Sequence, residues 1–125
     1  MLEVKALCKS YRGLPAIDKV SFGIRAGEIV GYVGPNGSGK STTVKIVTGL
    51  LEPNAGQVLF EGESIRLNLQ GYRAAFGYVP EEAHVYTHLS GLEYLQLVGR
   101  LRNMEENLIF QARSVLLAVV QHPAD

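Results

Sequence analysis

The stretch GPNGSGKST, from Gly34 to Thr42, decides the fold of this 125-residue chain. Three of its residues are glycine, and a single lysine, Lys40, stands near its end. Ordering a glycine costs about 0.5–1 kcal/mol more than ordering an alanine in regular structure, so a bound group should offset that cost. From Gly34 to Ser41 the stretch satisfies G-x-x-x-x-G-K-[ST] at every fixed position.

The sequence on either side supplies the context that this pattern requires. Residues 28–33 (EIVGYV) are nearly all apolar, which predicts a strand buried on both faces, as in a parallel sheet. Residues 40–50 place Val44, Val47 and Leu50 on one face of a predicted helix. The glycine stretch is therefore predicted to join a buried strand to a helix.

A loop of this kind suits phosphate. Glycines let successive backbone N–H groups turn inward around an anion, and the helix that begins near Lys40 adds unpaired N–H groups and the positive end of its dipole. Lys40 then supplies a charge for the outer phosphates, and Ser41 supplies a hydroxyl for Mg²⁺. The alternative, a glycine-rich turn with a solvated lysine, does not account for the full pattern.

Composition narrows the function further. Twelve basic residues balance twelve acidic ones, so no general attraction to nucleic acid is expected. Cys8 has no partner for an internal disulfide, which fits a reducing compartment. No apolar run approaches the roughly 18 residues that a spanning helix needs.

Further elements follow from periodicity and turn residues. Strands are predicted at 20–24, 57–62 and 75–80, with turns at 25–28 and 52–56. A helix is predicted from residue 90, where Ser90 and Glu93 form a capping-box pattern. A last helix ends before Pro123, with these residues at helical spacing: Leu108, Ala112, Val115, Leu116, Val119 and Val120.

The wider sequence resembles an ABC-type ATP-binding domain. The stretch LCKSYRGLPAIDKVSFGIRAGEIVGYVGPNGSGKSTTVKIVTGLLEPNAGQVLFEGESI (residues 7–65) and the stretch FGYVPEEAHVYTHLSGLEYL (76–95) carry the resemblance, which is greatest to ATP-binding subunits of bacterial ABC-2-type and multidrug exporters. It implies an α/β phosphate-loop core with an amino-terminal antiparallel β subdomain and the start of a helical subdomain. Residues 1–89 would form the core portion, and 90–125 the start of the helical subdomain, of a truncated domain.

The resemblance also implies site residues and cofactors, namely ATP and Mg²⁺. Tyr11 stands where the family has an aromatic side chain stacked on adenine; the alternative is a tyrosine packed in the core. Glu81 stands where the family usually has a glutamine that touches Mg²⁺ and the attacking water, and a carboxylate can ligate Mg²⁺. It would be catalytic together with Lys40, or it is a solvated loop acid, like Glu82. The nucleotide-binding residues would be Tyr11, Gly34, Pro35, Asn36, Gly37, Ser38, Gly39, Lys40, Ser41 and Thr42, with Ser41 and Glu81 as metal ligands.

As a family member, the complete protein would dimerise with a second ATP-binding domain and drive a transmembrane permease from the cytoplasmic face of the membrane. Contact with the permease would come through 81–95. Three family features are missing from the sequence: an LSGGQ-like signature, an apolar strand ending in Asp-Glu, and a late histidine, a position that His84, His88 and His122 do not occupy. The chain alone is therefore expected to bind ATP without turnover.

Alternatives remain open. In one alternative the chain is a non-catalytic nucleotide-binding or regulatory fragment. In another it is part of a soluble ABC ATPase of translation or repair. Its last segment, QARSVLLAVVQHPAD (111–125), is either the first helix of the helical subdomain or a later helix joined after an internal deletion.

Overall fold

The chain begins with an antiparallel hairpin of β1 (Leu2–Tyr11) and β2 (Leu14–Ile24). The two residues of its turn, Arg12 and Gly13, both have positive φ, 51° and 82°. Such a turn matches the right-handed twist of the two strands, and glycine adopts it without steric cost. The strand predicted at 20–24 is thus confirmed as the second half of a longer strand.

The computed structural model describes residues 1–81 and 86–121, with side chains as far as residue 114. Its contacts divide the chain into two units, residues 1–78 and 79–125. The first unit contains the sheet with α1 and α2, and the second contains α3 and α4.

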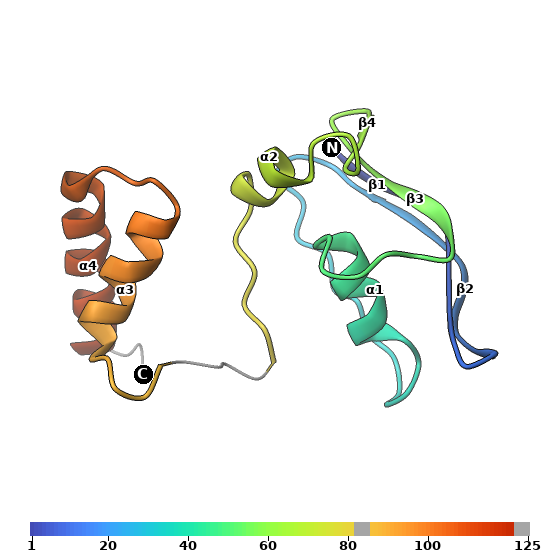
Figure 1. Cartoon of the computed structure of the whole chain (residues 1–125), viewed down its shortest axis with the longest axis horizontal. Coiled ribbons are helices and arrows are strands. Elements are labelled where there is room, and N and C mark those ends of the chain that lie inside the picture. Colours follow the sequence, from blue (N-terminus) through green and yellow to red (C-terminus); the bar gives the residue numbers. More distant parts are fainter. Residues whose placement is uncertain (82–85, 122–125) are drawn as a thin grey trace. The chain divides into compact units, whose positions relative to one another are not determined.

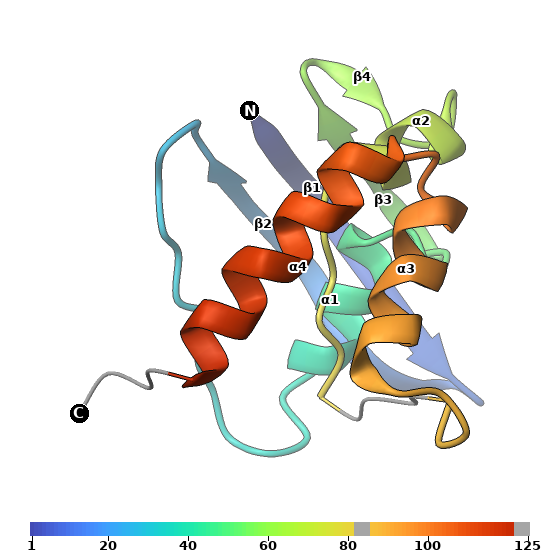
Figure 2. The same cartoon turned by 90° about the vertical axis from the view of Figure 1, so that its left-hand side faces the viewer.

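A second hairpin completes the sheet of the first unit. β3 (Ala55–Phe60) pairs with β1, and β4 (Glu63–Ser64) returns along β3 through a turn whose residues Glu61 and Gly62 again have positive φ. The strand order is β2-β1-β3-β4, and every pairing is antiparallel (Figure 2). The strand predicted at 57–62 exists but begins and ends two residues earlier, because Glu61 and Gly62 form the turn to β4.

α1 (Lys40–Val47) is shorter than the predicted helix. Its end is set by Gly49, whose φ of 70° places it in the left-handed region. The Gly49 N–H donates to the Ile46 carbonyl at 2.9 Å and the Leu50 N–H to the Lys45 carbonyl at 2.8 Å, which is a Schellman ending. The predicted apolar face is wrong in part, because Thr43 and Ile46 are the buried residues while Val44 and Leu50 are exposed.

The core of the first unit joins the sheet to α1 and α2 (Leu69–Ala74). Tyr72 packs its ring against Phe60 and Phe76, with centroid distances of 5.3 and 4.8 Å, and its hydroxyl donates to the Val47 carbonyl at 2.7 Å. The buried hydrophobic residues of this core are Val4, Leu7, Ile17, Ile46, Val58, Ile65 and Tyr72. This core fixes α1 against the sheet and so positions the start of that helix.

Residues 28–33, predicted to be a buried strand, form no strand (Figure 1, the segment between β2 and α1). Ile29 is 102% exposed and Val33 is 90% exposed. No strand among the described residues pairs with this segment. The prediction is wrong because apolar composition reports a preference for burial, whereas a strand also needs the N–H and C=O groups of a neighbour.

The strand predicted at 75–80 is also absent from the structure, for the same reason. Phe76 contributes its ring to the core beside Tyr72, whereas Val79 is exposed. An apolar run of this length contains too few residues to reveal its own partner.

The second unit is a pair of helices, α3 (Gly91–Leu101) and α4 (Glu106–Gln121). The capping box predicted at the start of α3 is confirmed: the Ser90 N–H donates to a Glu93 carboxylate oxygen at 2.8 Å, and the Glu93 N–H donates to the Ser90 hydroxyl at 3.3 Å. A second bond from the Ser90 hydroxyl, at 2.6 Å, acts with the N–H bond to hold the pKa of Glu93 below its ordinary value.

The two helices approach each other at Gly99. A Cβ atom at this position would lie 2.6 Å from a side-chain carbon of Ile109, so only glycine fits without movement. Ile109 is the buried residue of the described part of α4, while Leu108 and Ala112 are exposed, contrary to the predicted face. The remaining members of that face, Val115, Leu116, Val119 and Val120, lie outside the described side chains, as Pro123 lies outside the described residues.

Candidate functional site

A tight turn opens the glycine loop. The Ser38 N–H donates to the Pro35 carbonyl at 3.2 Å and closes a four-residue turn. Gly37 occupies the third position of this turn with a φ of 81°, a conformation that favours glycine. A Cβ atom on Gly34 would lie 2.7 Å from the Ser38 hydroxyl, so the chain folds back closely on itself at this point.

The end of the loop packs on β2. Gly39 has a φ of 86°, and a Cβ atom there would lie 2.4 Å from a methyl carbon of Ile17 and 2.5 Å from the Ala16 carbonyl oxygen. No other residue type fits this position without moving strand backbone. Gly39 therefore sets the distance between the loop and the sheet.

α1 starts directly after this glycine. Gly39 is the N-cap and provides no side chain, and the first intrahelical bond runs from the Thr43 N–H to the Gly39 carbonyl at 2.8 Å. The N–H groups of the preceding residues therefore lack intrahelical acceptors, as at every helix start. Together with the helix dipole they attract an anion.

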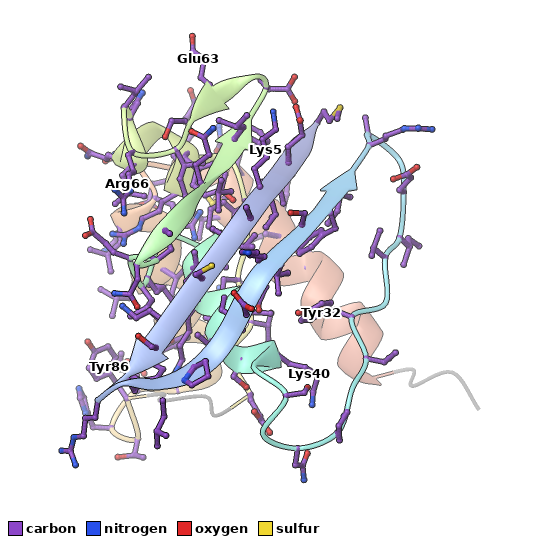
Figure 3. The ribbon with its side chains drawn as sticks, turned by 90° about the vertical axis from the view of Figure 1, so that its right-hand side faces the viewer. Lys5, Tyr32, Lys40, Glu63, Arg66 and Tyr86 are labelled. Carbon is purple, nitrogen blue, oxygen red and sulfur yellow. The ribbon has the colours of Figure 1, made fainter. Side chains whose placement is uncertain are left out.

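Lys40 brings the positive charge to the same loop (Figure 3). Its ammonium donates to the carbonyls of Gly34 and Pro35, each at 2.7 Å. An ammonium has three N–H donors, so one remains beyond these two bonds. The first turn of α1 and the Lys40 side chain thus offer donors for an anion around one loop.

The hydroxyl groups at the start of α1 suit a Mg²⁺ ion that is held mainly by the phosphates of a bound nucleotide. Ser41 is exposed at the start of α1, and Thr42 is half-buried. Among residues 1–81 and 86–121, no group of three or more His, Cys, Asp or Glu side chains could hold a metal ion. A protein-only metal cage is thus lacking in this part of the chain, whereas Mg²⁺ is usually held by one or two protein groups with substrate phosphates and waters.

Tyr11 lies at the end of β1, half exposed at 48%. The Lys9 ammonium lies 5.8 Å from its ring centroid, and the ring does not belong to the hydrophobic core. Tyr11 pairs with Leu14 of β2 in the hairpin. Two residues further along β2 is Ala16, whose carbonyl lies close to Gly39. Two strand residues span about 7 Å, so β2 connects the surroundings of Tyr11 with the end of the loop.

Two residues that the sequence did not single out also contact the loop region. Thr43 is a buried polar residue, 1% exposed, and its hydroxyl donates to the Gly39 carbonyl at 3.0 Å. The Tyr32 hydroxyl lies 3.3 Å from the same threonine oxygen. The position of Thr43, one turn into the predicted helix, was the only sequence signal for its contact with the loop. For Tyr32 the sequence showed only a tyrosine within an apolar run.

The model of the ABC transporter family matches residues 17–121, which include the loop, α1 and the later helices. The chain belongs to the ABC transporter family. The resemblance expected from residues 7–65 and 76–95 is thereby confirmed. Membership of the ABC transporter family implies nucleotide binding.

Two curated members of the family illustrate the relationship. The ABC-type transporter ATP-binding protein EcsA of Bacillus subtilis is 38% identical over 99 residues, which cover 79% of this chain and 40% of that protein. The lipopolysaccharide export system ATP-binding protein LptB of Escherichia coli is 38% identical over 104 residues, which cover 82% and 43%. The chain thus spans about two fifths of the length of these relatives.

Solved structures of ABC proteins share the fold. The structure of an ATP-binding subunit of an ABC transporter superposes with a TM-score of 0.77 at 36% identity, over 86% of this chain and 45% of that one. The dimeric structure of a bacterial ABC transporter cassette gives a TM-score of 0.75 at 26% identity, over 87% and 52%. The predicted fold class, an ABC-type phosphate-loop core with an antiparallel β subdomain and helices of a helical subdomain, is confirmed.

One predicted site residue of this ABC protein, Glu81, belongs to the second unit. Glu81 is exposed, and its role stays a prediction. His88 is exposed, and its ring centroid lies 5.7 Å from that of Tyr86. The predictions for Glu82, His84 and His122 lie outside the described residues. Every helix among residues 1–81 and 86–121 is too short or too polar to span a bilayer.

Proposed function

We propose that this chain binds MgATP through residues 34–42 and forms the nucleotide-binding part of a transporter subunit. One observation carries the proposal: Gly39, with its positive φ and its contact with β2, brings the uncapped start of α1 and the Lys40 ammonium to one loop. Membership of the ABC transporter family supports it. The relatives EcsA, a transporter ATP-binding protein, and LptB, a lipopolysaccharide export ATP-binding protein, favour transport over translation or repair.

Each part of the loop has a proposed role. The backbone N–H groups of Gly37 and of Gly39 to Thr42 donate to phosphate oxygens, and the side chain of Lys40 exchanges its bonds to Gly34 and Pro35 for the outer phosphates. Ser41 contributes its hydroxyl to Mg²⁺, which when bound neutralises charge on the phosphates. These interactions offset the entropic cost of a loop rich in glycine.

The proposed roles of the other residues rest on the family. Tyr11 stacks on adenine, for which its half-exposed ring beside Lys9 is suited. The Glu81 carboxylate binds Mg²⁺ and contacts the attacking water. Together with Lys40 it forms the proposed catalytic pair. We further propose that residues 1–89 belong to the nucleotide-binding core and 90–125 to the helical subdomain.

The whole protein is proposed to act at a membrane. ATP-binding subunits of this family generally pair with transmembrane subunits and dimerise. We therefore propose a transmembrane permease and a second ATP-binding domain as partners, with segment 81–95 facing the permease at the cytoplasmic face. No role in nucleic-acid binding is proposed for a chain whose charges balance.

Two lysines on one helix test the phosphate loop. Lys40 begins α1, whereas Lys45 lies in its last turn and is exposed. We expect Lys40→Ala to weaken binding of a fluorescent ATP analogue about 10- to 100-fold, because a hydrogen bond to a charged group contributes about 1.5–3 kcal/mol. Lys45→Ala removes the same charge and should leave the affinity unchanged. Equal losses in the two variants, measured by titration in the presence of Mg²⁺, would contradict the assignment of residues 34–42.

A further inference from the structure

We infer that Tyr32 is a positioning residue for the phosphate loop, which it orients through a hydrogen-bond relay that runs through Thr43 to the carbonyl of Gly39. This inference rests on the proposed binding of nucleotide by residues 34–42 and adds a determinant of affinity outside that pattern. Tyr32 precedes the loop and Thr43 follows it, so the relay ties the two flanks together.

The direction of the relay follows from counting protons. A threonine hydroxyl carries one hydrogen, and Thr43 uses it for the Gly39 carbonyl at 3.0 Å. The Tyr32 hydroxyl, 3.3 Å away, is then the donor, and the Thr43 oxygen accepts. The Gly39 carbonyl also accepts the Thr43 N–H at 2.8 Å, so one carbonyl is held by two donors from the same residue.

The Thr43 hydroxyl is buried, so loss of its hydrogen bonds would be costly. Thr43 is 1% exposed, and a buried hydroxyl is costly unless it is fully hydrogen-bonded. Tyr32 is 42% exposed and packs its ring near Phe22 of β2, with a centroid distance of 5.8 Å. In the same segment Ile29 and Val33 are far more exposed, at 102% and 90%, and Val30 is 50% exposed, so Tyr32 is the least exposed of these large side chains.

The held carbonyl determines where the next amide points. In a trans peptide the C=O of one residue and the N–H of the next are antiparallel, and this chain has no cis peptide bond among its described residues. With the Gly39 carbonyl directed into α1, the N–H of Lys40 is directed back toward the loop. That N–H is a donor of the proposed phosphate cradle, and the relay keeps it oriented before a ligand arrives.

Three substitutions separate hydrogen bonding from packing. Tyr32→Phe removes only the hydroxyl and keeps the ring beside Phe22. Thr43→Val keeps the buried volume and loses the hydroxyl, whereas Thr43→Ser loses a buried methyl group and keeps the hydroxyl. In titrations of the full chain with fluorescent MgATP analogue, we expect Tyr32→Phe to weaken binding about three- to tenfold, as loss of one ordinary hydrogen bond would.

The affinities of these variants should follow a pattern that packing of Tyr32 and Thr43 alone would not produce. Thr43→Val should weaken binding at least as much as Tyr32→Phe, and the double variant no more than Thr43→Val alone, because the relay needs both groups. Thr43→Ser should lower the free energy of unfolding, measured in urea, yet keep the affinity of the parent. If Thr43→Val does not fold, Tyr32→Phe still decides.

Each result has one meaning. Unchanged affinity in Tyr32→Phe, in a set of variants where the parent binds and Lys40→Ala binds more weakly, would overturn the relay alone. Additive losses in the double variant, or a loss in Thr43→Ser equal to that in Thr43→Val, would also overturn it. A parent chain that binds no nucleotide, or a Lys40→Ala variant that binds as the parent does, would overturn the proposed function and the relay with it.

Discussion

Replacement of Gly39 by alanine should destabilise the first unit far more than the same change at Gly37. Both glycines have similar positive φ values, 86° and 81°, and an L-residue pays about 1–2 kcal/mol in this region. Nothing lies within 4 Å of a Cβ atom on Gly37. On Gly39 the added atom would meet Ile17 at 2.4 Å and the Ala16 carbonyl at 2.5 Å.

Neither neighbour of Gly39 can move cheaply, because Ile17 is a core residue and Ala16 presents strand backbone. Such overpacking costs about 1–3 kcal/mol in addition. We therefore expect losses of about 2–5 kcal/mol for Gly39→Ala and about 1–2 kcal/mol for Gly37→Ala. The gain from a stiffer unfolded chain is common to both and cancels in the difference.

Urea unfolding followed by far-ultraviolet circular dichroism measures these losses as shifts in midpoint at constant slope. Gly31→Ala is the control, because its φ lies outside the left-handed region and its Cβ would meet nothing within 4 Å; it should match the parent or exceed its stability by about 0.4–1 kcal/mol, the gain from a stiffer unfolded chain. Equal midpoints for Gly37→Ala and Gly39→Ala would refute the reasoning, since the loop would then not pack against β2.

Three further predictions concern other parts of the chain. Tyr11→Ala should weaken MgATP binding by about 1–3 kcal/mol, the range for base–aromatic stacking, and Tyr11→Phe by little; equal affinity of parent and alanine variant in titrations would refute stacking on adenine. Burial raises the pKa of Tyr72 above 10.0, so its contribution to stability, intact below that pH, should decline as the pH rises and the unfolded tyrosine ionises first. Tyr72→Phe should remove this alkaline decline from the pH dependence of the unfolding midpoint, and an unchanged decline would contradict it. Bonds from the Ser90 hydroxyl and N–H lower the pKa of Glu93, so α3 should keep this stabilisation above about pH 4.5 and lose it as the pH falls through the lowered pKa. Glu93→Gln should flatten that acid loss of helicity in circular dichroism, whereas an identical acid transition would refute the assignment.

Local signals in the sequence predicted well those elements that carry their own hydrogen-bond partners. The capping box of Ser90 and Glu93 specifies a helix start through two side chains only three residues apart. The loop pattern likewise placed glycines at 37 and 39, where the structure has positive φ values that no other residue adopts as readily.

Features that depend on distant partners could not be predicted in this way. Residues 28–33 and 75–80 are apolar, but composition does not state which strand would pair with them. The buried face of α1 follows from the position of β1 and β2 beneath it, which selected Ile46 rather than Val44.

The site was predictable as far as its short pattern extends and no further. The contact of Gly39 with Ala16 joins segments more than twenty residues apart, and the relay from Tyr32 to Thr43 spans the loop. A tyrosine in an apolar run and a threonine in a helix have many uses, and only the tertiary contacts distinguish one use from another.

The order of pairing in the sheet has a consequence for synthesis on the ribosome. β1 and β2 meet through a two-residue turn, so this hairpin can form as soon as both strands have emerged. The second edge of β1 then stays unpaired until β3 emerges about thirty residues later and pairs with it. At roughly 5–20 residues per second, this interval lasts only a few seconds. The short β4 follows β3 directly and pairs with its last two residues, Leu59 and Phe60, almost as soon as they emerge. Translation from the amino terminus therefore leaves the second edge of β1 unpaired only briefly, and a pause after β2 would prolong its exposure.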